Sequence, residues 1–258
     1  MGIVMSIIII ESIGFSATHS ISNMLRLNGE NCVSHGTKNF RLNTRMGIEN
    51  LSFDEFHHQM IEESSNYLNC ISVHSNFSPE DISRTILGTN TKFIGLMRKS
   101  QYKQILSCYY WAINGFLNGR EDFTQHLIIT ENRFKKVLRE CGLPVNMQSC
   151  IMLYAFQHVL VYNLRLCTQA QKILFMEDVL DNPVRAVDLL GIENNSPLSL
   201  GVEQGPSHKE KVISFEFLSN AEEILSKISN QITVNIGTSN LTLFEVENLA
   251  RLKSIFNG

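Results

Sequence analysis

The chain has 258 residues, of which 43% are hydrophobic and 18% are charged, and its formal net charge at pH 7 is −3. This composition is typical of a globular protein with a sizeable core and excludes a disordered chain. The small negative charge argues against a nucleic-acid partner. No apolar run approaches the roughly 20 residues that a membrane helix needs, and the N-terminal run lacks the basic start of a signal peptide. We therefore expect a cytoplasmic protein without a membrane partner.

The six cysteines include no Cys-x-x-Cys pair, so we expect buried, reduced thiols and no metal site. Gly2 and Ser6 match the N-myristoylation pattern. Gly2 leads straight into a predicted buried strand, however, and we do not expect lipidation.

An apolar, β-branched run over residues 3–10 predicts a first strand that is buried on both faces. The run stops at Glu11 and Ser12, and apolar residues at helical spacing begin at Ile21. The stretch therefore predicts a strand, a tight loop and a helix. Such a loop favours a phosphate or sulfate group, because backbone N–H groups and the positive end of the helix point toward it. A purely structural turn is the alternative. Hydroxyl donors in or beside the loop are Ser16, Thr18 and Ser20.

Short apolar runs that end in polar residues predict four further strands, at 31–35, 69–74, 92–97 and 172–176. Helices are predicted between them. Capping patterns mark three helix starts, at Ser52 with Glu55, at Ser78-Pro79 and at Asn182-Pro183. The alternation predicts an α/β fold in which a central parallel sheet is flanked by helices.

The segment 101–170 is predicted to be helical, with a break at Gly142-Leu143-Pro144, and it forms an insertion before the last strand. Residues 194–211 are predicted to be a long loop, and a loop of that length is often functional. A helix is predicted from about Phe217 to Ser229, then a strand-like stretch at 231–237, then a terminal helix at 243–256. We expect the apolar face of the terminal helix to dock within a single domain spanning 1–258, and a homodimer is the alternative.

In open α/β sheets, ligands bind at the carboxyl ends of the strands. The residues predicted at those ends are Gly14 to Ser20, His35 to Lys38, His74, Arg98 with Lys99, and Glu177 with Asp178. This edge of the sheet therefore combines an anion loop, histidines and cations.

The series resembles the sulfotransferase superfamily, whose members transfer a sulfuryl group from 3′-phosphoadenosine-5′-phosphosulfate (PAPS) to a hydroxyl or amine. The segment 15–19, Phe-Ser-Ala-Thr-His, is similar to the family's Lys/Arg-Ser-Gly-Thr-Thr loop for the 5′-phosphosulfate. A strand that ends in Arg98, followed by Ser107, resembles the site for the 3′-phosphate. Residues 175–183, Phe-Met-Glu-Asp-Val-Leu-Asp-Asn-Pro, resemble the family's Tyr-Glu-Asp-Leu and Asp-Pro elements. The three segments occur in the family's order over most of residues 3–190.

The resemblance implies a P-loop-like three-layer sandwich, PAPS as donor and 3′-phosphoadenosine-5′-phosphate (PAP) as product, with no metal. It implies that His74 is the general base, with His35 as second choice, and that protonated His19 is an alternative cation in the loop. Segment 101–170 would form the acceptor pocket. The residues that the resemblance assigns to the donor are Gly14, Phe15, Ser16, Ala17, Thr18, His19, Ser20, Arg98, Lys99, Ser107, Lys209 and Lys211.

Three departures from the family pattern leave alternatives open. Phe15 replaces the family's cation, and Ala17 replaces its glycine, which costs energy if the backbone φ is positive. Arg98 lies one position further from Ser107 than in the family, so Lys99 is an alternative ligand of the 3′-phosphate. Lys209 and Lys211 either close over the nucleotide or form a solvated charge cluster.

The resulting hypothesis is a sulfotransferase that acts on a small-molecule or glycan acceptor. The first alternative is a catalytically weakened relative that binds a nucleotide or a partner without turnover, motivated by Phe15 and Ala17. The second, a kinase-like phosphotransferase, is disfavoured because the Gly-Lys-Ser/Thr loop and a clear magnesium carboxylate are missing.

Overall fold

The computed structural model describes residues 6–14, 16–34, 52–64, 69–75, 77–117, 134–192 and 220–237. The chain divides into two compact units. Unit 1 comprises Met1–Lys99 and Tyr162–Gln204, and unit 2 comprises Ser100–Val161 and Gly205–Gly258. The prediction of one domain over 1–258 stays a prediction. Several predicted features lie outside the described residues, namely the loop 194–211, the helix 243–256, Phe15, His35, Lys209 and Lys211.

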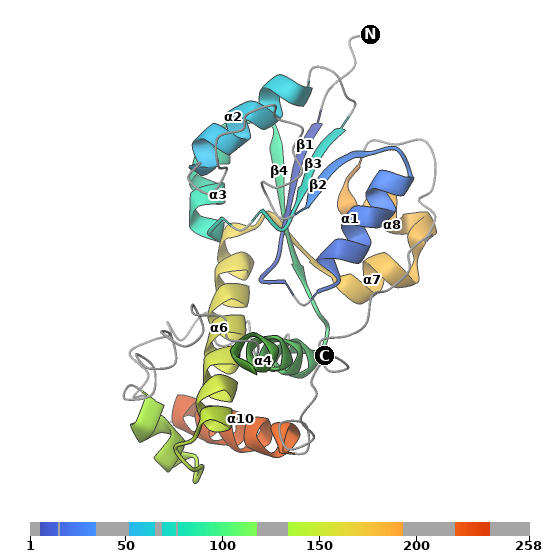
Figure 1. Ribbon diagram of the computed structural model, residues 1–258. Coiled ribbons are helices and arrows are strands. Elements are labelled where there is room, and N and C mark those ends of the chain that lie inside the picture. Colours follow the sequence, from blue (N-terminus) through green and yellow to red (C-terminus); the bar gives the residue numbers. More distant parts are fainter. Residues whose placement is uncertain are drawn as a thin grey trace. The chain divides into compact units, whose positions relative to one another are not determined.

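Unit 1 is built on a five-stranded parallel sheet with strand order β2-β3-β1-β4-β5 (Figure 1). The strands are β1 (Ser6–Glu11), β2 (Asn31–Ser34), β3 (Asn69–Val73), β4 (Thr91–Met97) and β5 (Lys172–Phe175). The most apolar strand, β1, lies at the centre and is buried along its whole length, as its β-branched run predicts. The predicted α/β fold with a central parallel sheet is confirmed.

Helices flank the sheet on both sides, with α2 and α3 on one and α1, α7 and α8 on the other (Figure 1). Their bounds are α1 (Thr18–Leu27), α2 (Phe53–Ser64), α3 (Pro79–Ile86), α7 (Met176–Asp181) and α8 (Pro183–Leu190). Apolar residues of α1 and α8 share one buried cluster with β1, β3 and β4. This core fixes the strands, and their carboxyl ends form the edge that carries the candidate site.

The three predicted helix starts are confirmed by their capping contacts. Ser52 and Glu55 form a reciprocal capping box, with Ser52 N–H donating to Glu55 at 2.8 Å and Glu55 N–H donating to Ser52 Oγ at 3.3 Å. Ser78 Oγ accepts from the N–H of Asp81 at 3.1 Å. Asn182 Oδ1 accepts from the N–H of Arg185 at 3.3 Å.

Unit 2 contains helices in all the parts that the structure describes. They include α4 (Gln101–Leu117), the first part of α6 (Met147–Gln169) and α10 (Ala221–Gly237). Residues 134–140 are also helical. In the sequence, α4 and α6 lie between β4 and β5, which are neighbours in the sheet. The predicted helical insertion is therefore confirmed for these residues.

The prediction of a strand-like stretch at 231–237 is wrong, because α10 continues through it to Gly237. The β-branched residues there suggested a strand, but their helix propensity is lower than that of alanine by less than about 0.7 kcal/mol each. Helix propagation is cheap once a first turn exists, and residues 221–230 supply a packed helix with buried Ile224, Leu225 and Ile228.

Within the described chain, one helix, α6, is long and apolar enough to cross a membrane by length and composition. Polar residues interrupt the apolar run of this helix, so the sequence alone did not predict a membrane span there. Of its most apolar stretch, 61% is buried inside the protein. The core helix of a soluble protein can have the same length and composition. The helix is therefore only a weak indication of a membrane protein.

All six cysteines are described and none forms a disulfide. Five are buried and Cys167 is half-buried, in agreement with the expected buried thiols. Burial raises the pKa of Cys32 to about 11, so this thiol stays protonated near neutral pH.

Candidate active site

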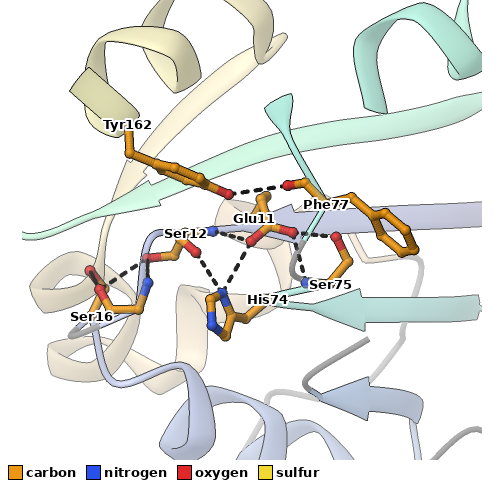
Figure 2. A network of polar contacts seen from close by, with 8 residues as sticks. Glu11, Ser12, Ser16, His74, Ser75, Phe77 and Tyr162 are labelled. Atoms are coloured by element: carbon orange, nitrogen blue, oxygen red, sulfur yellow. Dashed lines mark hydrogen bonds and ion pairs between the residues drawn. The ribbon is translucent and has the colours of Figure 1, made fainter. Parts of the chain in front are cut away.

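Glu11 is the centre of a polar network at the carboxyl ends of β1 and β3 (Figure 2). Its side chain is fully buried, and its two oxygens accept from groups on both sides of the strand end. Oε1 accepts from the N–H of Ser12 at 3.0 Å. Oε2 accepts from the N–H of Ser75 at 2.7 Å and from the Ser75 hydroxyl. Parallel pairing brings these residues together, because Ile10 lies opposite Val73 and the two strands end at the same edge.

His74 follows β3 and is turned back across the end of β1. Its backbone has a φ of 57°, and its N–H donates to the carbonyl of Ile10 at 2.8 Å. Ring Nδ1 lies 2.6 Å from the carbonyl oxygen of Ser12 and 3.1 Å from Glu11 Oε1. Positive φ is uncommon outside glycine and is tolerated better by His than by most residues. Contacts with the end of β1 and with Ser12 thus fix the imidazole, which follows β3 in the sequence.

The pKa of His74 is raised above its ordinary value of 6.5. Burial of the ring, which leaves 14% of the side chain exposed, lowers it. The hydrogen bond to Glu11, the negative charge of Glu11 and the hydrogen bond to the Ser12 carbonyl raise it, and together they outweigh burial. The contacts with Glu11 and Ser12 therefore favour the protonated form of the ring.

The loop between β1 and α1 is held by its own serines. Ser12 Oγ accepts from the N–H of Gly14 at 3.1 Å, and Ser16 Oγ donates to the carbonyl of Gly14 at 3.3 Å. Gly14 has a φ of 90°, and Ala17, which precedes the first turn of α1, has a φ of 50°. The predicted strand, tight loop and helix are confirmed.

The structure brings Gly14 close to His74, because a Cβ built at Gly14 would lie 3.8 Å from His74 Nε2. The other predicted ligands in and beside this loop differ in their exposure to solvent. Ser16 and Thr18 are buried, Ser20 is half-buried, and His19 is exposed on the first turn of α1. Their contacts with a donor stay predictions.

The predicted cations at the end of β4 lie against the acidic first turn of α7. Arg98 Nε is 3.9 Å from Glu177 Oε1, and Lys99 Nζ is 2.5 Å from Asp178 Oδ1. The backbone N–H of Lys99 also donates to Glu177 at 2.9 Å. The hydrogen bond that Lys99 donates to Asp178 and the charges of nearby carboxylates raise the pKa of Lys99. Ser107 is half-buried on α4 in unit 2, and the prediction that it shares a phosphate with Arg98 or Lys99 stays a prediction.

The sequence did not predict that Glu11, Ser75 and Tyr162 belong to the polar network around His74. The Tyr162 hydroxyl donates to the carbonyl of Phe77 at 3.3 Å. Burial and the negative charge of Glu11 raise the pKa of Tyr162. One sequence signal was available, since a carboxylate directly after a fully apolar strand is either buried or at a ligand-binding edge. The contacts with Ser75 and Tyr162 leave no local signal.

The arrangement combines a histidine whose proton is shared with a buried carboxylate, a glycine loop beside it, and two cations at the end of a neighbouring strand. Among the described residues, no group of three or more His, Cys, Asp or Glu would hold a metal ion. No protein-family model, curated protein or solved structure matches the chain.

Proposed function

We propose that the chain is a sulfotransferase that uses PAPS as donor, a hydroxyl or amine of a small molecule or glycan as acceptor, and His74 as general base. The observation that carries the proposal is the imidazole of His74, held by Glu11 and the Ser12 carbonyl beside the loop that joins β1 to α1. A general base needs a side chain that can titrate near neutral pH and a fixed position; histidine is such a side chain, and contacts with Glu11 and Ser12 hold this ring.

The transfer is an in-line displacement at sulfur. The acceptor oxygen or nitrogen attacks the sulfur of PAPS with its electron pair while its proton passes to His74. The bond from sulfur to the bridging phosphate oxygen breaks, and that oxygen keeps the bonding pair. The products are the sulfated acceptor, PAP and a protonated His74, which then returns its proton to solvent.

The donor is a substrate, and the described residues fit it in part. The proposal includes a P-loop-like use of the β1–α1 loop, in which backbone N–H groups at the start of α1 face the phosphosulfate. Arg98 and Lys99 supply positive charge for the 3′-phosphate, Arg98 in a bidentate manner and Lys99 as a point charge. Binding would require them to exchange their carboxylate partners for the phosphate.

A catalytically weakened relative is the second candidate, and two observations favour it. Arg98 and Lys99 are already paired with Glu177 and Asp178, and Ser16 is buried with its hydroxyl directed at Gly14. Each of these contacts lowers the affinity for a phosphate unless the side chain leaves its present partner when the phosphate binds. Such a protein would bind PAP or a partner without turnover.

Calorimetric titration with PAP tests the donor site, with 5′-AMP and with ATP plus magnesium as comparison ligands. We expect micromolar binding that depends on the 3′-phosphate and weakens about tenfold or more in Arg98→Ala and Lys99→Ala. Arg84→Ala is the matched control, since Arg84 is also ion-paired but lies on the exposed surface of α3. Binding of ATP with magnesium in place of PAP would point to the kinase-like alternative.

Turnover then separates an enzyme from a weakened relative. Radiolabelled PAPS is offered with pools of hydroxyl and amine acceptors, and the labelled product is followed. His74→Ala should abolish transfer and keep PAP affinity, whereas His58→Ala, at an exposed histidine of α2, should leave both unchanged. Tight PAP binding with no transfer to any pool supports the weakened relative. Absence of PAP binding rejects the sulfotransferase and leaves only a relative that binds a partner.

A further inference from the structure

The contacts of the Glu11 carboxylate are all with donors. Oε1 receives the Ser12 N–H and faces His74 Nδ1, and Oε2 receives both the N–H and the hydroxyl of Ser75. Tyr162, from α6, adds its hydroxyl to the surroundings of the same carboxylate. A buried acceptor with this many partners is fixed in position, because any rotation would leave buried donors unpaired.

The contacts of His74 determine which ring nitrogen carries the proton. Nδ1 lies between the Ser12 carbonyl at 2.6 Å and Glu11 Oε1 at 3.1 Å. A carbonyl oxygen only accepts, so Nδ1 must be the donor. A neutral imidazole has one N–H, and the lone pair that can take a proton is therefore on Nε2.

The ring also points Nε2 toward the loop. A Cβ at Gly14 would lie 3.8 Å from Nε2 and 3.9 Å from Cε1, so the edge of the ring that carries the lone pair lies beside a residue without a side chain. The backbone at His74 is left-handed, with φ 57°. Such a backbone persists in a non-glycine residue only where surrounding contacts determine it, and it is frequent at functional sites.

We infer that Glu11 is a positioning residue, which shares the Nδ1–H of His74 with the Ser12 carbonyl and stabilises the imidazolium that forms when Nε2 takes the acceptor proton. The catalytic part of this inference rests on the proposed function. The structural part concerns the protonation of His74 alone and holds whatever the acceptor is. Glu11 touches neither substrate nor donor in this scheme and acts through His74.

The titratable groups around the ring are few among the described residues. Glu11 comes from β1, and it is the charge that acts on His74. Tyr162 comes from α6, and the Arg165–Glu80 pair at 3.4 Å acts on Tyr162. Among substitutions outside His74, removal of the charge of Glu11 should therefore change the titration of this imidazole most.

Nuclear magnetic resonance of ¹⁵N-labelled histidine rings in the full chain tests the structural part. In the unaltered protein, we expect His74 as the Nδ1–H tautomer with a pKa above 6.5, assigned by loss of its signals in His74→Gln. In Glu11→Gln, the pKa of His74 should fall by about one unit. Glu62→Gln is the matched control, since it removes the carboxylate beside exposed His58 and should leave His74 unchanged.

An Nε2–H tautomer in the unaltered protein would overturn the inference without any variant, so failure of Glu11→Gln to fold leaves it testable. An unchanged pKa of His74 in folded Glu11→Gln would overturn it as well. These results are independent of PAP binding. A protein that shows the expected tautomer and pKa but binds no PAP disproves the proposed function and keeps the structural part.

Kinetics test the catalytic part once an acceptor is found. Glu11→Gln should lower kcat with little change in the KM for PAPS. Transfer needs unprotonated His74, so kcat/KM rises with pH through the pKa of His74, and this limb should move to lower pH in Glu11→Gln by the shift seen in the spectra. A lower kcat with an unmoved limb would contradict the catalytic part, because Glu11 would then not act through the pKa of His74.

Discussion

At the scale of single residues, Ala17 is a strained point of the β1–α1 loop. Its φ of 50° lies in the left-handed region, which costs a non-glycine residue roughly 1–2 kcal/mol, and no side-chain hydrogen bond caps the helix there. We expect Ala17→Gly to raise the free energy of unfolding by about 0.5–1 kcal/mol after the entropy of the glycine in the unfolded chain is subtracted.

Urea unfolding measures this difference, and Ala186→Gly is the control. Ala186 lies within α8 at an ordinary helical position, so the same exchange there should lower stability by about 1 kcal/mol. Equal losses at both positions would contradict the assigned strain. The sequence marked Ala17 as a departure from a family pattern, but only the backbone angle shows that it has an energetic cost.

Gly95 permits close packing of β4 against β5 and the end of α6. A Cβ on this residue would lie 2.6 Å from Ile173 Cδ1 and 3.4 Å from the Cβ atoms of Leu166 and Ala170. Gly95→Ala should therefore destabilise the protein by about 1–3 kcal/mol, as overpacked core positions do.

A double-mutant cycle with Ile173→Val tests this cause. The valine lacks the Cδ1 atom, so the double variant should recover most of the loss that Gly95→Ala shows alone. If the two effects simply add, the clash with Ile173 is not the reason for the glycine.

The role of Glu11 illustrates what residue patterns do and do not predict. The apolar run before it predicts a buried strand correctly, because burial on both faces is a local property of the strand. The partners of Glu11 are 63 and 64 residues away, and their approach depends on the pairing of β1 with β3. No spacing in the sequence encodes that pairing, so the candidate base could be predicted but not the carboxylate that holds it.

At the scale of elements, α3 depends on its N-terminal cap. Ser78 Oγ accepts from the N–H of Asp81 at 3.1 Å, and its hydroxyl donates to the Asp81 carboxylate at 2.7 Å. Ser78→Ala should lower the free energy of unfolding by about 1 kcal/mol, because an N–H group of the first turn loses its acceptor. Ser83→Ala, in the same helix but past the first turn, should stay within about 0.5 kcal/mol of the unaltered protein in urea unfolding.

Helix starts were predictable from sequence, whereas the extent of α10 was not. A cap is a contact between residues three positions apart, and its pattern is therefore visible in a short window, as at Ser52, Ser78 and Asn182. The state of residues 231–237 depends instead on the helix that precedes them. Local propensity decides such a segment only when nothing else does.

At the scale of the whole molecule, the order of strands and helices was the most predictable feature. Alternation favours parallel strands with helices on both faces, and unit 1 has that arrangement. The central place of β1 also follows from its composition. The strand order β2-β3-β1-β4-β5 does not, since several orders bury the same apolar strands.

The dependence of stability on pH is a property of the whole molecule in which two histidines have opposite effects. His57 is buried, and its Nε2 lies 2.7 Å from Thr91 Oγ1. Burial lowers the pKa of His57 below 6.5. Unfolding then takes up a proton, so stability is full above pH 6.5 and is lost as pH falls through the folded pKa. The raised pKa of His74 has the reverse sign, because its contribution is full below pH 6.5 and is lost as pH rises through the folded pKa.

Urea unfolding from pH 5 to pH 8 separates the two contributions through the slopes of two variants against the unaltered protein. His57→Gln should become relatively more stable as pH falls, because it removes the group that must stay neutral. His74→Gln should become relatively less stable as pH falls, because it removes the ion pair with Glu11. Each difference should amount to about 1.4 kcal/mol per unit of pKa shift. Slopes of the same sign would mean that one of the two imidazoles does not have the contacts assigned to it. The slope for His74→Gln would also show whether Glu11 acts on that ring in solution.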